Sequence, residues 1–277
     1  MPVAVALALF LIAPQVHSVP TCSDFVHKLP NVNAALCQIA ALKDSGARSV
    51  QGRPIWVRDI EPEDGAGGAP QRVLVVGAIH GDELSAASVA LHWIRLAQDA
   101  PANTPLPVHW RFVPALNPDG LLSRPPRRVN ASGVDLNRNF PTPNWQRDAA
   151  AYWEKRTRKD PRRWPGPKPL SEPESRFLHE QMLSFKPHLI VSIHAPYGVL
   201  DFDGPSVPPS KLGRLYQDQV GIFPGSLGNY AGVHKGVPVV TIELPNSTRT
   251  PLDAEMRQMW RDLQRWMGER MTAPVGK

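Results

Sequence analysis

Residues 73–83 read VLVVGAIHGDE, and this stretch decides the expected fold. Its first part, Val73 to Ile79, is a nearly continuous apolar run rich in β-branched residues, which is typical of an interior strand of a mainly parallel sheet. The next residues are polar, and a helix is predicted from Leu84 to Ala97. In open α/β sheets ligands bind beyond the carboxyl ends of the strands, so His80 and Glu83 stand where a site is expected.

Further strands and helices alternate on both sides of this stretch. Residues 19–50 are expected to form a short helical lead-in, and Ser171 and Glu174 have the spacing of a capping box at a helix start. The alternation predicts an α/β fold with a mixed, mainly parallel sheet and helices on both faces. The expected strands are Pro54–Glu61, Val108–Leu116, His188–Ile193 and Val237–Leu244, and the expected helices are Ser171–Phe185 and Leu252–Met271.

Length and composition are those of one soluble globular domain. The chain has 277 residues, of which 42% are apolar and 20% are charged. A chain of this size can bury a large core without help from disulfides or structural metals. We find no repeats and no low-complexity linker, and we expect residues 19–277 to form a single catalytic domain.

Positive charge is concentrated in one segment. The net charge is +6, and residues 147–168 contain eight lysines and arginines: Arg147, Lys155, Arg156, Arg158, Lys159, Arg162, Arg163 and Lys168. Such a segment can attract nucleic acid, an anionic membrane or an acidic substrate. No nucleic-acid-binding motif accompanies it, so we expect a solvated loop or helix face and no nucleic-acid partner.

The N-terminus has the pattern of a secretory signal. An apolar run from Val3 to Ala13 precedes small residues around Ser18, which predicts a signal peptide over residues 1–18 and export to the periplasm or the medium. The alternative is a buried N-terminal strand or helix. The run is too short to cross a bilayer, and no transmembrane segment is expected later. In an oxidising compartment Cys22 and Cys37 would form one disulfide, and otherwise they would be two buried thiols.

The ends of three expected strands carry residues that suit a metal. Zinc is held by imidazole nitrogens and carboxylates, and a catalytic site leaves one position open for water. A His-x-x-Glu pair alone is a weak signal, because a lone histidine is more often structural. Here His194 ends a second apolar strand and Glu243 ends a third. The sheet would therefore bring His80, Glu83, His194 and Glu243 to one edge.

A motif elsewhere in the chain carries a resemblance to a known family. Residues 133–141 read GVDLNRNFP, and this run is similar to a signature of the zinc carboxypeptidases. The resemblance extends over about residues 50–270 and implies that family's α/β/α sandwich. Other segments resemble family landmarks in the family's order: GAIHGDE at 77–83, NPDG at 117–120 and SEPE at 171–174.

The resemblance assigns roles to the residues at the strand ends. His80, Glu83 and His194 match the family's metal ligands, which implies one zinc ion per chain. Glu243 matches the general base that takes a proton from the metal-bound water. Such a carboxylate can pass that proton to the leaving amine.

The family also implies roles for several polar residues between the strands. Asn137 and Arg138 match the pair that binds the terminal carboxylate of a substrate, which a guanidinium can do with two hydrogen bonds. Arg128 best matches the arginine that stabilises the oxyanion, with Arg127 and Arg124 as rivals.

Two features leave alternatives open. Outside this motif, Arg138 would be expected to form an ordinary ion pair with Asp135 or Asp119. The digestive members of the family carry a tyrosine on a mobile loop ahead of the general base, and Tyr216 and Tyr230 are the candidates in this chain.

Two segments resemble a bacterial murein peptide amidase branch of the family. They are residues 224–230, which include Ser226 of its specificity loop, and residues 194–205. Members of that branch cut the amide between γ-D-glutamate and meso-diaminopimelate in cell-wall peptides. Asp201 or Asp203 would pair with the distal ammonium of diaminopimelate, or else cap a turn. A peptide ending in lysine lacks the distal carboxylate and should be a poorer substrate.

Three other functions remain open from the sequence. One is a general metallocarboxypeptidase that removes C-terminal residues from peptides or proteins. Another is a non-catalytic peptidoglycan-binding module, which would be expected to lack the metal ligands or the base. An N-acyl amino acid deacylase shares the His-x-x-Glu pair, but the run from Asn137 to Phe140 favours a peptidase. The sequence does not decide the oligomeric state.

Overall fold

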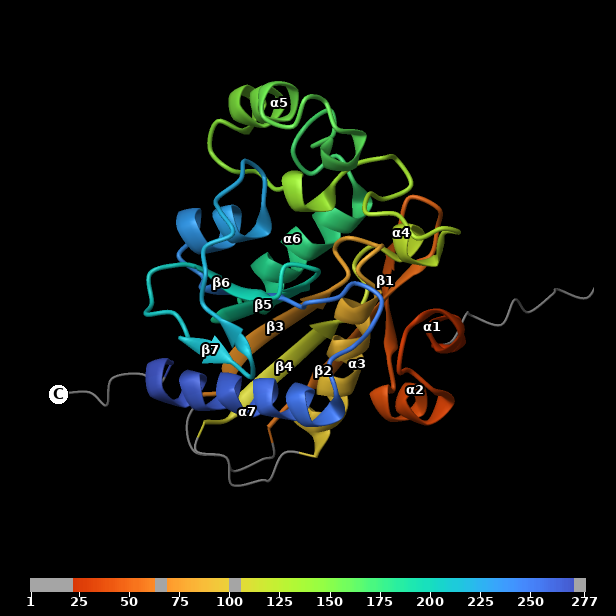
Figure 1. Ribbon diagram of the computed structural model, residues 1–277, viewed down its shortest axis with the longest axis vertical. Coiled ribbons are helices and arrows are strands. Elements are labelled where there is room, and N and C mark those ends of the chain that lie inside the picture. The colour runs from red at the N-terminus through yellow and green to blue at the C-terminus, as the bar shows by residue number, and fades with distance from the viewer. Residues whose placement is uncertain (1–21, 63–68, 100–105, 272–277) are drawn as a thin grey trace, which may run out of the picture.

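The computed structural model describes residues 22–62, 69–99 and 106–271. The predicted signal peptide lies outside the described residues. Within them, seven strands form one sheet in the order β1-β2-β4-β3-β5-β9-β6 (Figure 1). These strands are β1 (Lys43–Arg48), β2 (Pro54–Ile60), β3 (Gln71–Gly77), β4 (Val108–Val113), β5 (Leu189–His194), β6 (Val199–Asp203) and β9 (Val239–Glu243).

The sheet is parallel at its centre and antiparallel at its edges. Strands β4, β3, β5 and β9 run parallel to one another, whereas β2 and β1 on one side and β6 on the other run antiparallel to their neighbours. All six residues of β5 are buried, as expected for a strand covered on both faces. The predicted mixed, mainly parallel sheet is confirmed.

Helices cover both faces of this sheet, and β3 illustrates how the two cores are divided. Val73 and Val75 point into the core that contains α2, α3 and α7, whereas Leu74 and Val76 point into the core that contains α6 and η3. Successive side chains of a strand alternate between the faces, so one apolar run supplies both cores. The helices are α2 (Ala34–Ala40), α3 (Leu84–Gln98), α6 (Pro173–Phe185), α7 (Asp253–Arg270) and the π-helix η3 (Gly228–His234).

Shorter elements complete the described fold. Within it, no helix is both long and apolar enough to cross a membrane. The short elements are α1 (Ser23–Lys28), α4 (Pro118–Leu122), η1 (Leu136–Arg138), α5 (Trp145–Lys155), η2 (Pro161–Arg163), and the hairpin of β7 (Lys211–Leu212) and β8 (Leu215–Tyr216).

The N-terminal lead-in is only partly helical. Helices α1 and α2 are present, and a disulfide joins Cys22 to Cys37, whose Cα atoms are 5.7 Å apart. The prediction is wrong for residues 43–48, which form the edge strand β1. Its side chains are mostly exposed, so the strand is held by backbone pairing with β2 rather than by an apolar pattern that sequence reading would detect.

The predicted capping box is also wrong. Helix α6 begins at Pro173 with Glu172 as its N-cap, one residue after Ser171. Glu174 is buried and accepts hydrogen bonds from the Asn130 side chain at 3.0 Å and from the Val50 backbone at 3.1 Å. Its carboxylate therefore joins α6 to two neighbouring loops instead of closing the helix end.

Candidate active site

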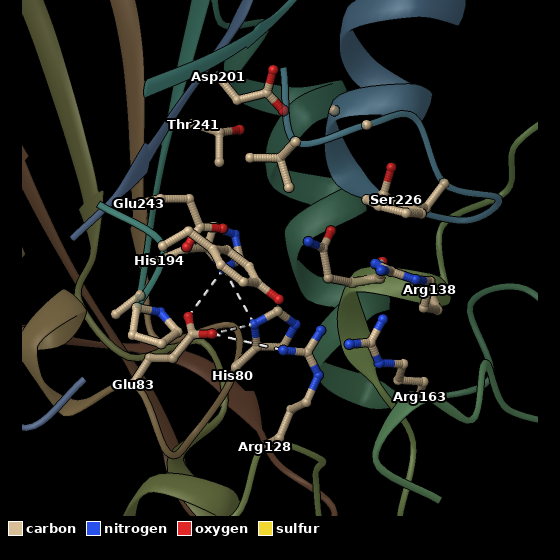
Figure 2. Close-up of a pocket in the computed structure, with 18 of the residues that line it drawn as sticks. His80, Glu83, Arg128, Arg138, Arg163, His194, Asp201, Ser226, Thr241 and Glu243 are labelled. Atoms are coloured by element: carbon tan, nitrogen blue, oxygen red, sulfur yellow. Dashed lines mark hydrogen bonds and ion pairs between the residues drawn. The ribbon is translucent and has the colours of Figure 1, made fainter. Parts of the chain in front are cut away.

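The three candidate metal ligands meet at the carboxyl edge of the central strands (Figure 2). His80 follows β3, Glu83 is the N-cap residue of α3, and His194 is the last residue of β5. Nδ1 of His80 lies 2.8 Å from Glu83 Oε1, and Nδ1 of His194 lies 3.0 Å from Glu83 Oε2. The two Nδ1 atoms are 3.2 Å apart.

This donor set fits a zinc ion. Ligand atoms about 2.0–2.1 Å from a tetrahedral zinc are separated from one another by about 3.3 Å, close to the spacing seen here. Both imidazoles turn Nδ1 to the shared point and Nε2 outward: His80 Nε2 lies 3.1 Å from Asp135 Oδ1, and His194 Nε2 lies 2.9 Å from Ser192 Oγ. Partners behind the ring fix the orientation of metal-binding histidines in this way.

Asp135 connects the metal centre to the substrate side of the pocket. It is fully buried, accepts a hydrogen bond from the Asn137 backbone at 3.0 Å, and bonds Arg128 Nη2 at 3.0 Å. Burial alone would raise the pKa of Asp135, but the positive charges of Arg128 and His80 hold it well below its usual range. Asp135 is therefore ionised and neutralises the cation beside it.

The structure separates the three candidate oxyanion arginines. Arg128 lines the pocket, and its Nη1 lies 3.7 Å from Glu83 Oε1. Arg124 and Arg127 are exposed and do not line it. Because Asp135 holds one edge of the Arg128 guanidinium, the group is fixed beside the ligands, where charge on a substrate oxygen would develop.

Glu243 lies opposite this arginine, at the end of β9. It pairs in register with His194 and is 6% exposed. Its Oε2 is buried and has no hydrogen-bond partner within the described residues. Burial raises the pKa of Glu243 although the neighbouring His194 opposes this. An unsatisfied carboxylate with a raised pKa next to a metal centre suits a general base.

Arg138 is buried without a counterion. Its Nη1 donates to the Asn137 backbone oxygen at 2.6 Å, and its guanidinium lies 4.4 Å from the ring centre of Phe223. The ion pair with Asp135 or Asp119 does not form, because those carboxylates pair with Arg128 and Arg53. Within the described chain, the Nε atom of Arg138 also lacks a partner. A buried guanidinium without a counterion is suited to binding an anion.

The loop that contains Ser226 forms the wall beside Arg138. The Asn137 side-chain oxygen accepts a hydrogen bond from Leu227 N at 2.8 Å, so Asn137 holds this loop and keeps its NH₂ group as a donor. Gly225 has a φ of 75°, and a Cβ atom there would collide with the Arg138 carbonyl. Ser226 lines the pocket, and its Oγ accepts from Asn229 N at 3.2 Å.

The opposite end of the pocket is acidic. Asp201 and Asp203 lie on the same face of β6, and Thr241 pairs with Asp201 across the sheet. Since Val199 pairs with Glu243, the two aspartates lie about 7 Å and about 14 Å along the strand from the base.

Neither aspartate has a cationic partner among the described residues. Asp201 accepts hydrogen bonds from the Phe202 and Val220 backbones, and burial raises its pKa. Burial and the charge of Asp201 raise the pKa of Asp203 to about 6. The Asp203 side chain packs against Gly228, where a Cβ atom would collide with its carboxylate. Both aspartates lie within strand β6, so the alternative prediction that they cap a turn does not match their position.

The pocket, about 270 Å³ in volume, also contains residues that sequence reading missed. Arg162 and Arg163 line it although their side chains stay 59% and 39% exposed, so two members of the solvated basic segment also border the pocket. Tyr216 and Tyr230 do not line it, and Tyr230 instead bonds His179 at 2.8 Å. The other unpredicted lining residues include Tyr197, Phe223 and Thr241. Among these residues, only Phe223 could have been found from the sequence, because it directly precedes residues 224–230, which resemble a specificity loop.

A model of the zinc carboxypeptidases, peptidase family M14, matches residues 27–202. The chain belongs to the zinc carboxypeptidase family. It is therefore an enzyme, a metallopeptidase of that family. The matched residues include the three candidate ligands and end before Glu243.

Relatives within the zinc carboxypeptidases include proteins named murein peptide amidase A. The one from Vibrio campbellii is 30% identical over 219 residues, or 76% of this chain and 81% of the relative. The one from Escherichia coli K12 is 29% identical and covers 70% and 79%. The crystal structure of a murein-tripeptide amidase from Escherichia coli O157 is 26% identical, covers 81% of this chain and 92% of its own, and has a TM-score of 0.56.

Proposed function

We propose that this enzyme hydrolyses the γ-D-glutamyl–meso-diaminopimelate amide of murein peptides, with one zinc ion per chain. Relatives named murein peptide amidase A support the substrate class. The observation that carries the proposal is the polarity of the pocket. An uncompensated cation, Arg138, and two uncompensated carboxylates, Asp201 and Asp203, line the pocket. Arg138 and Asp201 lie apart from each other around the candidate metal ligands (Figure 2). Diaminopimelate offers a carboxylate to the first and a distal ammonium to the second.

The roles of the residues follow from their positions. His80, Glu83 and His194 would hold the zinc ion, which supplies a water of lowered pKa and polarises the scissile carbonyl. Glu243 accepts the proton of the attacking water at its unpartnered Oε2 and then delivers it to the leaving amine. Arg128 donates hydrogen bonds to the carbonyl oxygen as negative charge develops on it.

Recognition of the leaving group is divided between the two walls. Arg138 and the Asn137 NH₂ group bind the carboxylate next to the scissile amide, which fixes the register of the peptide. The side chain of diaminopimelate then extends along β6, where Asp201 meets its ammonium. Asp203 lies farther along the same face.

Three peptides test this recognition: L-Ala-γ-D-Glu followed by meso-diaminopimelate, by 2-aminopimelate or by lysine. Aminopimelate lacks only the distal ammonium, and lysine lacks only the distal carboxylate. The kcat/KM for the diaminopimelate peptide should exceed that for the aminopimelate peptide by about 10-fold to 100-fold, because Asp201 is then left unpaired in a desolvated pocket. The lysine peptide, which lacks the distal carboxylate, should also be a poorer substrate.

The variant Asp201→Asn should remove the preference over aminopimelate. Asp99→Asn, which removes the same charge from an exposed residue outside the pocket, should leave it intact. Equal rates on all three peptides, or preferred release of ordinary C-terminal residues, would instead favour a general carboxypeptidase. Binding without hydrolysis of any peptide would favour a peptidoglycan-binding module.

We also propose export with removal of residues 1–18. The apolar run before Ser18 and the Cys22–Cys37 disulfide support it. N-terminal sequencing of protein from the periplasm or medium is expected to begin near Val19. Intact Met1 on a cytoplasmic protein would contradict export.

A further inference from the structure

A short basic turn lies at the mouth of the pocket, far from the metal ligands in sequence. It is η2, and Asp160 caps it by accepting a hydrogen bond from Arg162 N at 2.9 Å. Arg162 Nη2 bonds Asp82 Oδ2 at 2.7 Å. Because Asp82 lies between the ligands His80 and Glu83, this ion pair ties the turn to the metal-binding loop.

The next residue, Arg163, is left with only a weak partner. Its Nε lies 3.5 Å from Asp160 Oδ2, and its side chain is 39% exposed. The guanidinium lies beside Arg128 and Arg138 (Figure 2). Burial is the main cause of the lowered pKa of Arg138, and the positive charges of Arg128 and Arg163 contribute to it.

Four arginines at this end, Arg128, Arg138, Arg162 and Arg163, face three carboxylates that are not candidate metal ligands, namely Asp82, Asp135 and Asp160. Asp135 neutralises Arg128 and Asp82 neutralises Arg162, whereas Arg138 has no carboxylate partner in the described chain. Like charges held close together are unfavourable unless an anion lies between or beside them. One substrate carboxylate satisfies Arg138. Arg163 can take a second, because its only carboxylate contact among the described residues is the long one to Asp160.

The position of Arg163 indicates which group supplies that second carboxylate. Figure 2 shows Arg163 beside Arg128 and Arg138 and away from Asp201. With the leaving residue placed as proposed above, from Arg138 toward Asp201, Arg163 would be left for the acyl side of the scissile bond. In an ordinary α-linked peptide that side presents a neutral backbone carbonyl. A γ-linked glutamyl group differs because its α-carboxylate stays free, separated from the scissile carbonyl by a short methylene chain.

Resting on the function proposed above, we propose that Arg163 is a specificity-determining residue that binds the free α-carboxylate of the γ-glutamyl group. The Arg162–Asp82 ion pair holds η2 where Arg163 can reach it. The enzyme therefore recognises a charge on each side of the scissile amide, and it selects a free carboxylate on the acyl residue in addition to the leaving residue.

The test uses two peptides that differ at one group: L-Ala-γ-D-Glu-meso-diaminopimelate and the same peptide with the glutamyl α-carboxylate converted to a carboxamide. The wild-type kcat/KM should be about 10-fold to 100-fold higher for the free acid, the effect of one hydrogen-bonded charge pair. Arg163→Gln should lower only the rate on the free acid and so abolish the preference. Arg163→Lys should restore part of it, since it keeps the charge but not the planar fork.

Arg156→Gln is the matched control, because it removes one exposed positive charge from the same basic segment outside the pocket. It should leave the preference unchanged, and thermal unfolding should show that both glutamine variants are folded. Equal wild-type rates on the two peptides would overturn this inference but leave the proposed function standing. Equal losses on both peptides in Arg163→Gln would overturn it too. If neither peptide is hydrolysed, the proposed function fails as well.

Discussion

The metal side and the substrate side of this pocket satisfy their polar groups in opposite ways. On the metal side each imidazole has a partner behind it, Asp135 for His80 and Ser192 for His194. On the proposed substrate side Arg138 and Asp201 are buried, Asp203 is partly buried, and none has an oppositely charged partner in the described residues. In the function proposed above, the groups that would hold the metal are positioned in advance by the protein, whereas the groups that would hold the substrate keep their charges uncompensated until it binds.

The largest effect should come from Glu243, which stands where the two sides meet. Glu243→Gln keeps the size of the side chain and removes only its ability to accept a proton. We expect kcat to fall by about 10²–10⁴-fold, the usual contribution of a general base. Metal content, measured by elemental analysis of purified protein, should stay at one equivalent of zinc.

His194→Ala serves as the contrasting variant, since it removes a ligand and should lose the zinc. If Glu243→Gln also lost its zinc, the division between ligands and base would be wrong. If it retained normal turnover, the base would have to be another residue.

The candidate metal ligands and the base could be predicted from the sequence because they lie at the ends of strands that the apolar pattern reveals. His80, Glu83, His194 and Glu243 each follow a buried apolar strand, and the ends of parallel strands share one edge. The antiparallel edge strands were harder to predict. Strand β1 has mostly exposed side chains, so only its pairing with β2 identifies it.

The substrate side was only partly readable. Arg138 follows from the 133–141 motif, but Arg163 sits among basic residues of which most are exposed, and composition cannot distinguish it from them. It is placed in the pocket through the contact between Arg162 and Asp82, which are 80 residues apart. Contacts between such distant segments depend on the whole tertiary fold rather than on a local pattern.

The next effect concerns the uncompensated cation. Arg138→Lys preserves the positive charge but loses the planar fork and its stacking on Phe223. We expect kcat/KM for the murein tripeptide to fall by about 10-fold to 100-fold, because a bidentate contact with the substrate carboxylate becomes a single one. Arg156→Lys, an exposed site in the same chain, should have no measurable effect. Unchanged kinetics in Arg138→Lys would make Arg138 a structural residue.

The smallest effect is a pH dependence at the acidic end. The pKa of Asp203 is raised from 3.8 to about 6 by burial and by Asp201, so its carboxylate loses its charge as the pH falls from 7 to 5. A neutral Asp203 no longer attracts the substrate ammonium. The ratio of kcat/KM for the diaminopimelate peptide to that for the aminopimelate peptide should therefore fall several-fold over this range. The ratio cancels the titration of Glu243, which affects both peptides equally.

Ionisation of Asp203 should lower the stability of the folded protein, although it favours recognition of the substrate ammonium. A carboxyl whose folded pKa is raised binds its proton more tightly in the folded state, so its stabilising contribution is present at low pH and lost as the pH rises from 3.8 to about 6. Because the group is partly solvated, the loss is about 1 kcal/mol. Urea unfolding at pH 4 and pH 7 should show that the wild type changes its stability less favourably than Asp203→Asn by about this amount, because all other groups titrate in both proteins. If ionisation of Asp203 instead stabilised the wild-type protein, this carboxylate would already have a cationic partner. The acidic end of the pocket would then not be uncompensated in the absence of substrate.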